Sequence, residues 1–192
     1  MRGKFYYCKN SSKAVLLYGE AFKKVEELLE ELVEAFLEHQ LSALILEMEE
    51  ERREELLNLK EAKQFLRMRG IKPAGFLGFG SAGRLLLHHP VYLFGFEFLI
   101  LLSYPLVSPD GKRRDVEPFL KLSLPTLFIA SKKDPLSSER IVRQLASRNP
   151  LFSFYFLKGV SRYFRVDVSR DAEVNAGLSE IICLWLKENS NL

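Results

Sequence analysis

The stretch AGFLGFGSAG, residues 74–83, joins a buried strand to a helix through a turn built from small residues. Its first part, Ala74 to Phe79, is a continuous apolar run of the kind that forms a strand covered on both faces of a sheet. The glycines that follow allow a sharp change of direction, and a short helix then runs to His89, where Pro90 ends it. A strand that leads through a tight turn into a helix is the repeating unit of α/β proteins.

The same alternation of strand and helix continues along the whole chain. Segments with apolar residues at every third or fourth position, such as Phe22, Val25 and Leu29, separate the apolar runs. Predicted strands cover residues 14–18, 44–46, 74–79, 96–103, 126–130 and 152–157; predicted helices cover residues 20–38, 49–69 and 171–187, besides the one to His89 and one that holds Ile141 and Leu145 and is capped by Ser137 or Ser138. The pattern predicts one α/β domain over residues 1–192, a three-layer αβα sandwich with a mostly parallel sheet. Counted from the 14–18 strand, we expect the order 2-1-3-4-5-6.

Composition excludes several classes of function. The net charge is +3, from 28 basic and 25 acidic residues among 192, which is too balanced for a nucleic-acid-binding surface. The two cysteines, Cys8 and Cys183, predict neither a disulfide framework nor a metal site. No signal peptide or membrane span is recognisable, so the expected location is the cytoplasm, away from membranes. Long Glu-, Lys- and Arg-rich helices are typical of proteins from heat-adapted sources.

Two further motifs carry a family resemblance. The first is Tyr104-Pro105-Leu106 followed by Pro109-Asp110-Gly111-Lys112, and the second runs from Pro125 to Pro135 as PTLFIASKKDP. Together with the turn at residues 78–83, they resemble the dienelactone-hydrolase-like branch of the α/β-hydrolases, over residues 14 to 188. The resemblance implies a minimal α/β-hydrolase fold and a nucleophile elbow, the strained turn that presents a serine at the start of a helix.

The resemblance also implies where a Ser-His-Asp triad would lie. Alignment of the elbow on its outer glycines puts Gly80 at the nucleophile position, and an alternative register puts Ser81 there. The acid position matches Asp134. The base position is Arg162, which cannot act as a general base because arginine stays protonated. We therefore expect Arg162 to pair with Asp134; the alternative is that Arg162 points into solvent while Asp134 caps the following turn.

Topology places the histidines away from this site. In such a sheet the strands run toward the active edge and the helices run back from it. His39, His88 and His89 all end helices, so we expect them at the opposite edge. The residues expected to bind a ligand or an oxyanion at the active edge are Gly19, Gly80, Ser81, Tyr104 and Arg162.

Two other readings of the same residues stay open. Gly78-x-Gly80-x-x-Gly83 fits a dinucleotide-binding pattern, although it follows the third strand and not the first, and tight helix–strand packing is the favoured interpretation. Glu20, Glu47 and Glu49 could join Asp134 in a carboxylate cluster, or they could simply favour helix N-termini. We expect no cofactor and no metal.

Two classes of function follow. The first is a hydrolase-like protein without a working triad that acts through binding or assembly, with a small-molecule or protein partner that the sequence does not identify; a homodimer is left open. The second is an ester or thioester hydrolase that uses Ser81 without a histidine.

Overall fold

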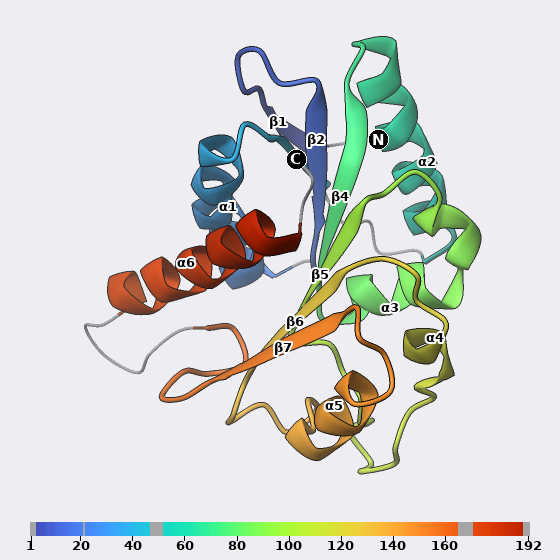
Figure 1. Cartoon of the computed structure of the whole chain (residues 1–192), viewed down its shortest axis with the longest axis vertical. Coiled ribbons are helices and arrows are strands. Elements are labelled where there is room, and N and C mark those ends of the chain that lie inside the picture. Colours follow the sequence, from blue (N-terminus) through green and yellow to red (C-terminus); the bar gives the residue numbers. More distant parts are fainter. Residues whose placement is uncertain (1–2, 21, 47–51, 165–170, 190–192) are drawn as a thin grey trace.

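The computed structural model describes residues 3–20, 22–46, 52–164 and 171–189. A seven-stranded sheet runs through the middle of the molecule in the order β1-β3-β2-β4-β5-β6-β7 (Figure 1). The strands are β1 (Gly3–Tyr6), β2 (Lys13–Tyr18), β3 (Ser42–Leu46), β4 (Lys72–Phe79), β5 (Phe98–Leu102), β6 (Thr126–Ser131) and β7 (Phe152–Leu157). Without β1, this is the predicted order, and all of these neighbours are parallel. The edge strand β1 pairs antiparallel with β3.

Helices cover both faces of the sheet and complete the predicted three-layer sandwich. They are α1 (Lys23–Glu38), α2 (Arg52–Met68), α3 (Ser81–His88), α4 (Glu117–Leu120), α5 (Glu139–Ala146) and α6 (Asp171–Asn189), with a 3₁₀ turn, η1, over Pro90–Leu93. In Figure 1, α1 and α6 lie on one side of the sheet, while α2, α3, α4 and α5 lie on the other. Among the described residues, no helix has the length and apolar character needed to cross a lipid bilayer.

The two apolar cores lie on the two faces of the sheet. Neighbouring residues of one strand enter different cores, as Phe76 and Leu77 of β4 do. Both faces are therefore covered, which is why the central strands read as unbroken apolar runs instead of alternating ones.

The first helix begins later than its periodicity predicts. The pattern places its start at Glu20, but α1 begins at Lys23 because Phe22 has an extended backbone, with φ −116° and ψ 133°. Glu20 consequently lies in the connection that follows β2, at the carboxyl edge of the sheet.

Candidate functional site

Gly80 forms the turn between β4 and α3. Its φ of 59° and ψ of −124° lie in a region that residues with a side chain rarely occupy. Its N–H donates a hydrogen bond to the carbonyl oxygen of Leu102 at 2.8 Å, which ties the turn to the end of β5. The nucleophile elbow is a strained strand-to-helix turn of this kind. Ser81 instead begins α3, so the backbone favours the register that aligns Gly80 with the nucleophile.

The other glycines of the motif serve close packing. A Cβ atom on Gly78 would lie 2.7 Å from Gly83 Cα, which is closer than real Cβ contacts. The glycine spacing is therefore accounted for by the approach of α3 to β4, the second of the two interpretations of the dinucleotide-like pattern.

The Glu20 carboxylate lies over the elbow. A Cβ atom on Gly80 would collide with Glu20 Oε1 and would lie 2.6 Å from Glu20 Cδ. The backbone N–H of Ser81 donates to Glu20 Oε1 at 3.1 Å. In α/β-hydrolases the N–H of the residue after the nucleophile is one donor of the oxyanion hole. Glu20 thus puts a negative oxygen at the place where such a hole would receive one.

Arg162 contacts the same oxygen. Its Nη2 donates to Glu20 Oε1 at 3.3 Å, and the two side chains are only 21% and 16% exposed. The pair joins residues that are far apart in the sequence, one after β2 and one after β7. Glu20 therefore bridges the start of α3 and the Arg162 guanidinium.

Two serines at the ends of strands hold the segment that carries Arg162. Ser103, at the end of β5, donates from Oγ to the Arg162 carbonyl oxygen at 2.7 Å. Ser131, the last residue of β6, donates from Oγ to the Val160 carbonyl oxygen and accepts a bond from the Lys133 N–H at 2.9 Å. This explains why a serine suits position 131, which the sequence alone did not explain.

Aromatic packing fixes the same segment against β4. The ring of Tyr163 stacks on that of Phe79, with centroids 5.9 Å apart and planes 12° apart, and Phe22 meets its edge at 6.4 Å. Phe164 is fully buried and contacts Phe79 edge-on. The residues before and after Arg162 are therefore held in place by hydrogen bonds and aromatic contacts.

The expected ion pair between Arg162 and Asp134 is not formed. Asp134 uses both oxygens in the turn after β6: Oδ2 accepts from Ser137 Oγ at 2.7 Å, and Oδ1 accepts from the Leu136 N–H at 3.0 Å. Arg162 pairs with Glu20 instead. Asp134 is already satisfied within its own turn, while Ser103 at the end of β5 and Phe79 of β4 hold the segment after β7 close to the elbow, where Glu20 lies.

Three further predictions concern helix caps and ligand contacts. Ser138 occupies the N-cap of α5 but its side chain makes no capping bond. Tyr104, expected to bind a ligand, is only 1% exposed and meets Phe119 edge-on, and burial raises the pKa of its phenol. It is a core residue and not a ligand contact. Gly19 is required by packing, because a side chain there would collide with Val25.

Ser81 and the histidines lie apart. His39 follows α1 and lines a surface hollow with residues 10–13, at the amino ends of β2 and β3. His88 and His89 end α3, one full helix away from Gly80. All three are thus placed at the ends of returning helices, as predicted. Within the described ranges, Ser81 Oγ has no hydrogen-bond partner.

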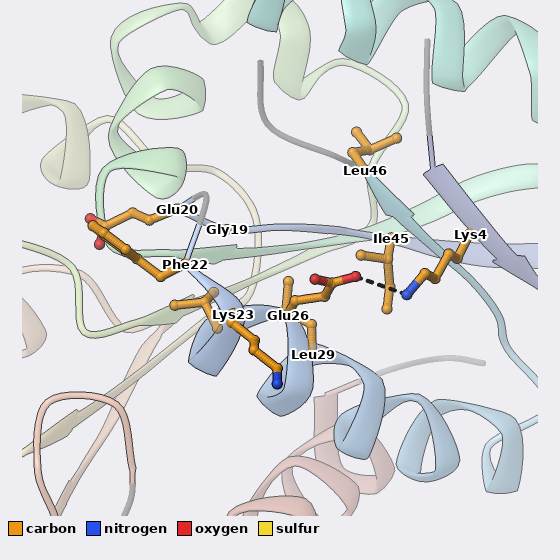
Figure 2. Close-up of a pocket in the computed structure, with 10 residues that line it drawn as sticks. Lys4, Gly19, Glu20, Phe22, Lys23, Glu26, Leu29, Ile45 and Leu46 are labelled. Atoms are coloured by element: carbon orange, nitrogen blue, oxygen red, sulfur yellow. Dashed lines mark hydrogen bonds and ion pairs between the residues drawn. The ribbon is translucent and has the colours of Figure 1, made fainter. Parts of the chain in front are cut away.

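A cavity of about 420 Å³ lies beside Glu20, at the carboxyl ends of β2 and β3 (Figure 2). Lys4 from β1 forms one wall and bonds to Glu26 at 2.8 Å, which raises the pKa of Lys4. The rest of the lining comes from Gly19, Phe22, Lys23, Val25, Leu29, Ile45 and Leu46. The lining of the cavity therefore combines charged side chains with apolar ones.

Of the four residues of the predicted carboxylate cluster, the structure describes Glu20 and Asp134. Glu47 and Glu49 lie outside the described residues, and Glu20 and Asp134 have separate partners. In the described part of the chain, no three His, Cys, Asp or Glu side chains gather so that they could hold a metal ion. Cys8 and Cys183 are free thiols.

No protein-family model and no curated protein matches the sequence. Solved structures do match over nearly the whole chain. The esterase domain of a Rhodothermus marinus protein aligns with 97% of this chain and 92% of its own, at a TM-score of 0.73 and 13% identity. This chain has the α/β-hydrolase fold. An esterase of Pyrococcus furiosus aligns with 98% of this chain and 90% of its own, at a TM-score of 0.72 and 12% identity.

A third protein of the fold, Est1E from Butyrivibrio proteoclasticus, has a TM-score of 0.68 at 11% identity and aligns with 96% of this chain and 94% of its own. Identities this low show the fold alone. The assignment to a dienelactone-hydrolase-like branch stays a prediction.

Sequence reasoning missed the contacts of Glu20, for which it predicts only a helix N-terminal position or a place in a carboxylate cluster. A signal did exist. The predicted strand order puts the residue after the 14–18 strand next to Gly80, where the side chain is missing, and Arg162 supplies an unmatched positive charge at the same edge.

Proposed function

We propose that this chain is an α/β-hydrolase-fold protein that has lost Ser-His-Asp catalysis and acts through binding or assembly. The observation that carries the proposal is the Glu20 carboxylate, which lies over Gly80 and accepts a hydrogen bond from the Ser81 N–H.

Each element of catalysis meets an obstacle at this edge. Gly80 has no side chain that could attack a carbonyl carbon. Arg162 remains protonated and cannot accept the proton of a nucleophile. An oxyanion hole stabilises negative charge that develops in the transition state, and a carboxylate already bound there both occupies the donor and repels that charge.

The cavity beside Glu20 supports a binding role. Its volume falls within the range of small-molecule sites, and Lys4, Lys23 and Glu26 provide charge around an apolar floor.

A second candidate is an ester hydrolase that uses Ser81. The esterase neighbours favour it, and so does the position of Ser81 at the N-terminus of α3, where free N–H groups favour an oxyanion. Loss of a nucleophile or its base costs on the order of a million-fold in rate, so residual activity without histidine would be small.

An assay of ester turnover separates the two candidates. We would measure hydrolysis of p-nitrophenyl acetate and butyrate, and of methyl ferulate because Est1E has been solved with ferulic acid bound. The proposal predicts rates equal to the enzyme-free control and no labelling by a fluorophosphonate probe. A rate that Ser81→Ala abolishes and Ser147→Ala leaves unchanged would establish the second candidate, since Ser147 is an exposed serine at the end of α5.

A further inference from the structure

Two large apolar side chains project into solvent beside η1. Val91 is 75% exposed and Phe94 is 82% exposed. They are three residues apart, at the second residue of the 3₁₀ turn and just after its end. Because residues three apart in a 3₁₀ helix lie on the same side, the two form one apolar wall. Neighbouring exposed apolar side chains of this size mark interaction sites more often than chance.

The opposite wall is a basic stripe on α2. Lys60, Gln64 and Arg67 are spaced by four and three residues, so they share one face of the helix. A hollow of about 310 Å³ separates this stripe from the apolar wall. It lies near the amino edge of the sheet, where α2 leads into β4 and η1 leads into β5, and it is thus separate from the Glu20 site.

Lys63 fixes the apolar wall in place. Its Nζ donates to the carbonyl oxygens of Tyr92 at 2.6 Å and Phe94 at 3.0 Å, and it lies 3.9 Å from the centre of the Phe96 ring. Burial, and to a lesser degree the nearby Arg67, lowers the pKa of Lys63 to about 8. These bonds hold the backbone at Tyr92 and Phe94, so the position of the apolar wall does not depend on what the Val91 and Phe94 side chains contact.

Among the described residues, the basic side chains that line the hollow form no ion pair. These are the side chains of Lys60, Lys63 and Arg67. Glu97, which directly precedes β5, is bound by Lys13 and Lys72. One basic wall and one apolar wall therefore face each other across a space of small-molecule size.

We propose that this hollow binds a small organic anion with an apolar body, such as a medium-chain aliphatic or an aryl carboxylate. Arg67 and Lys60 pair with the carboxylate, and Arg67 suits a two-pronged bond to it. Val91 and Phe94 cover the apolar body. The volume lies at the lower end of known ligand pockets, which fits a short ligand.

The test uses 8-anilinonaphthalene-1-sulfonate, an aromatic anion whose fluorescence rises when it is bound. We expect saturable binding to the intact protein and displacement by octanoate. Acetate, which lacks the apolar body, and octan-1-ol, which lacks the charge, should displace the probe at least about tenfold less effectively, since each loses one of the two contacts and 1.4 kcal/mol corresponds to a factor of ten.

Three variants assign the binding to this hollow. Arg67→Glu and Phe94→Ser should each weaken octanoate at least about tenfold, by the loss of one contact class. Lys133→Glu makes the same charge change at an exposed residue on the other edge and should have no effect. Thermal melting checks that each variant folds. Unchanged octanoate affinity in both variants would overturn the proposal. The proposal would also be overturned if the protein bound phosphatidylglycerol vesicles and octanoate did not displace the probe, since the apolar wall would then be a membrane contact.

Discussion

Replacement of Glu20 and Arg162, singly and together, measures the contact on which the site depends. Glu20→Gln and Arg162→Met keep most of the side-chain volume and remove one charge each. Among the described residues, Arg162→Met leaves the Glu20 carboxylate with the Ser81 N–H alone. Within the same residues, Glu20→Gln removes the acidic partner of the guanidinium, whose Nε is already buried without a hydrogen bond. Each single variant should therefore lose more than half of the free energy of unfolding that the double variant loses.

The size of the coupling follows from the geometry. Two unit charges 3.3 Å apart attract by about 5 kcal/mol at an effective dielectric constant of about 20, and by about 1.3 kcal/mol in bulk water. The side chains are 16% and 21% exposed, so solvent screens the pair in part. We expect a coupling free energy of about 1–2 kcal/mol, well above the value for an exposed pair.

The measurement is urea unfolding followed by circular dichroism, with a double-mutant cycle at each of two sites. The matched control is the pair of Lys121 with Glu117, which is 2.8 Å long but 73% and 63% exposed. It should give about 0.3–0.5 kcal/mol, and 1 M NaCl should reduce it more than the buried pair. A coupling between Glu20 and Arg162 no larger than that of the control would refute this account of the site.

Two other predictions test the elbow and the buried lysine. Gly80→Ala should destabilise the fold by about 2 kcal/mol or more, because of the positive φ and the collision with Glu20; in a Glu20→Ala background the same change should cost less, and equal costs in urea unfolding would contradict the packing argument. Lys63 binds its proton more weakly when folded, since its pKa falls from 10.5 to about 8. Its contribution to stability is thus complete above the unfolded pKa and is lost as the pH falls through about 8. The stability of wild type relative to Lys63→Met should therefore rise by about 2 kcal/mol between pH 7.5 and 10.5, and a flat difference would show that the pKa is not lowered.

The fold was predictable because its determinants are repeated. Each parallel strand is an apolar run and each helix an amphipathic stretch, so one misplaced boundary does not change the order of the sheet. The start of α1 shows the limit of this reasoning. Periodicity extends the helix back to Glu20, but Phe22 is extended and its ring meets that of Tyr163 edge-on. Tyr163 lies 141 positions later, and no local pattern reveals that contact.

The site was harder to predict because it depends on which loops meet. Family resemblance aligned Arg162 and Asp134 as partners, and the segments after β6 and β7 do meet, since Ser131 Oγ donates to the Val160 carbonyl oxygen. Asp134 is instead satisfied within its own turn by Leu136 and Ser137. Two residues can occupy matching positions in a family pattern and still make different contacts, because a carboxylate takes the nearest donors.

Gly80, Glu20 and Arg162 are physically interdependent. A side chain at position 80 would collide with the Glu20 carboxylate, so Glu20 can lie over the elbow only because Gly80 leaves the space free. The carboxylate in turn has a partly buried charge that needs a cation, and Arg162 supplies it. A neutral histidine at position 162 would leave that charge uncompensated. Placing a serine at position 80 or a histidine at position 162 alone would therefore work against the other two residues, and an arrangement with both would require that Glu20 change as well.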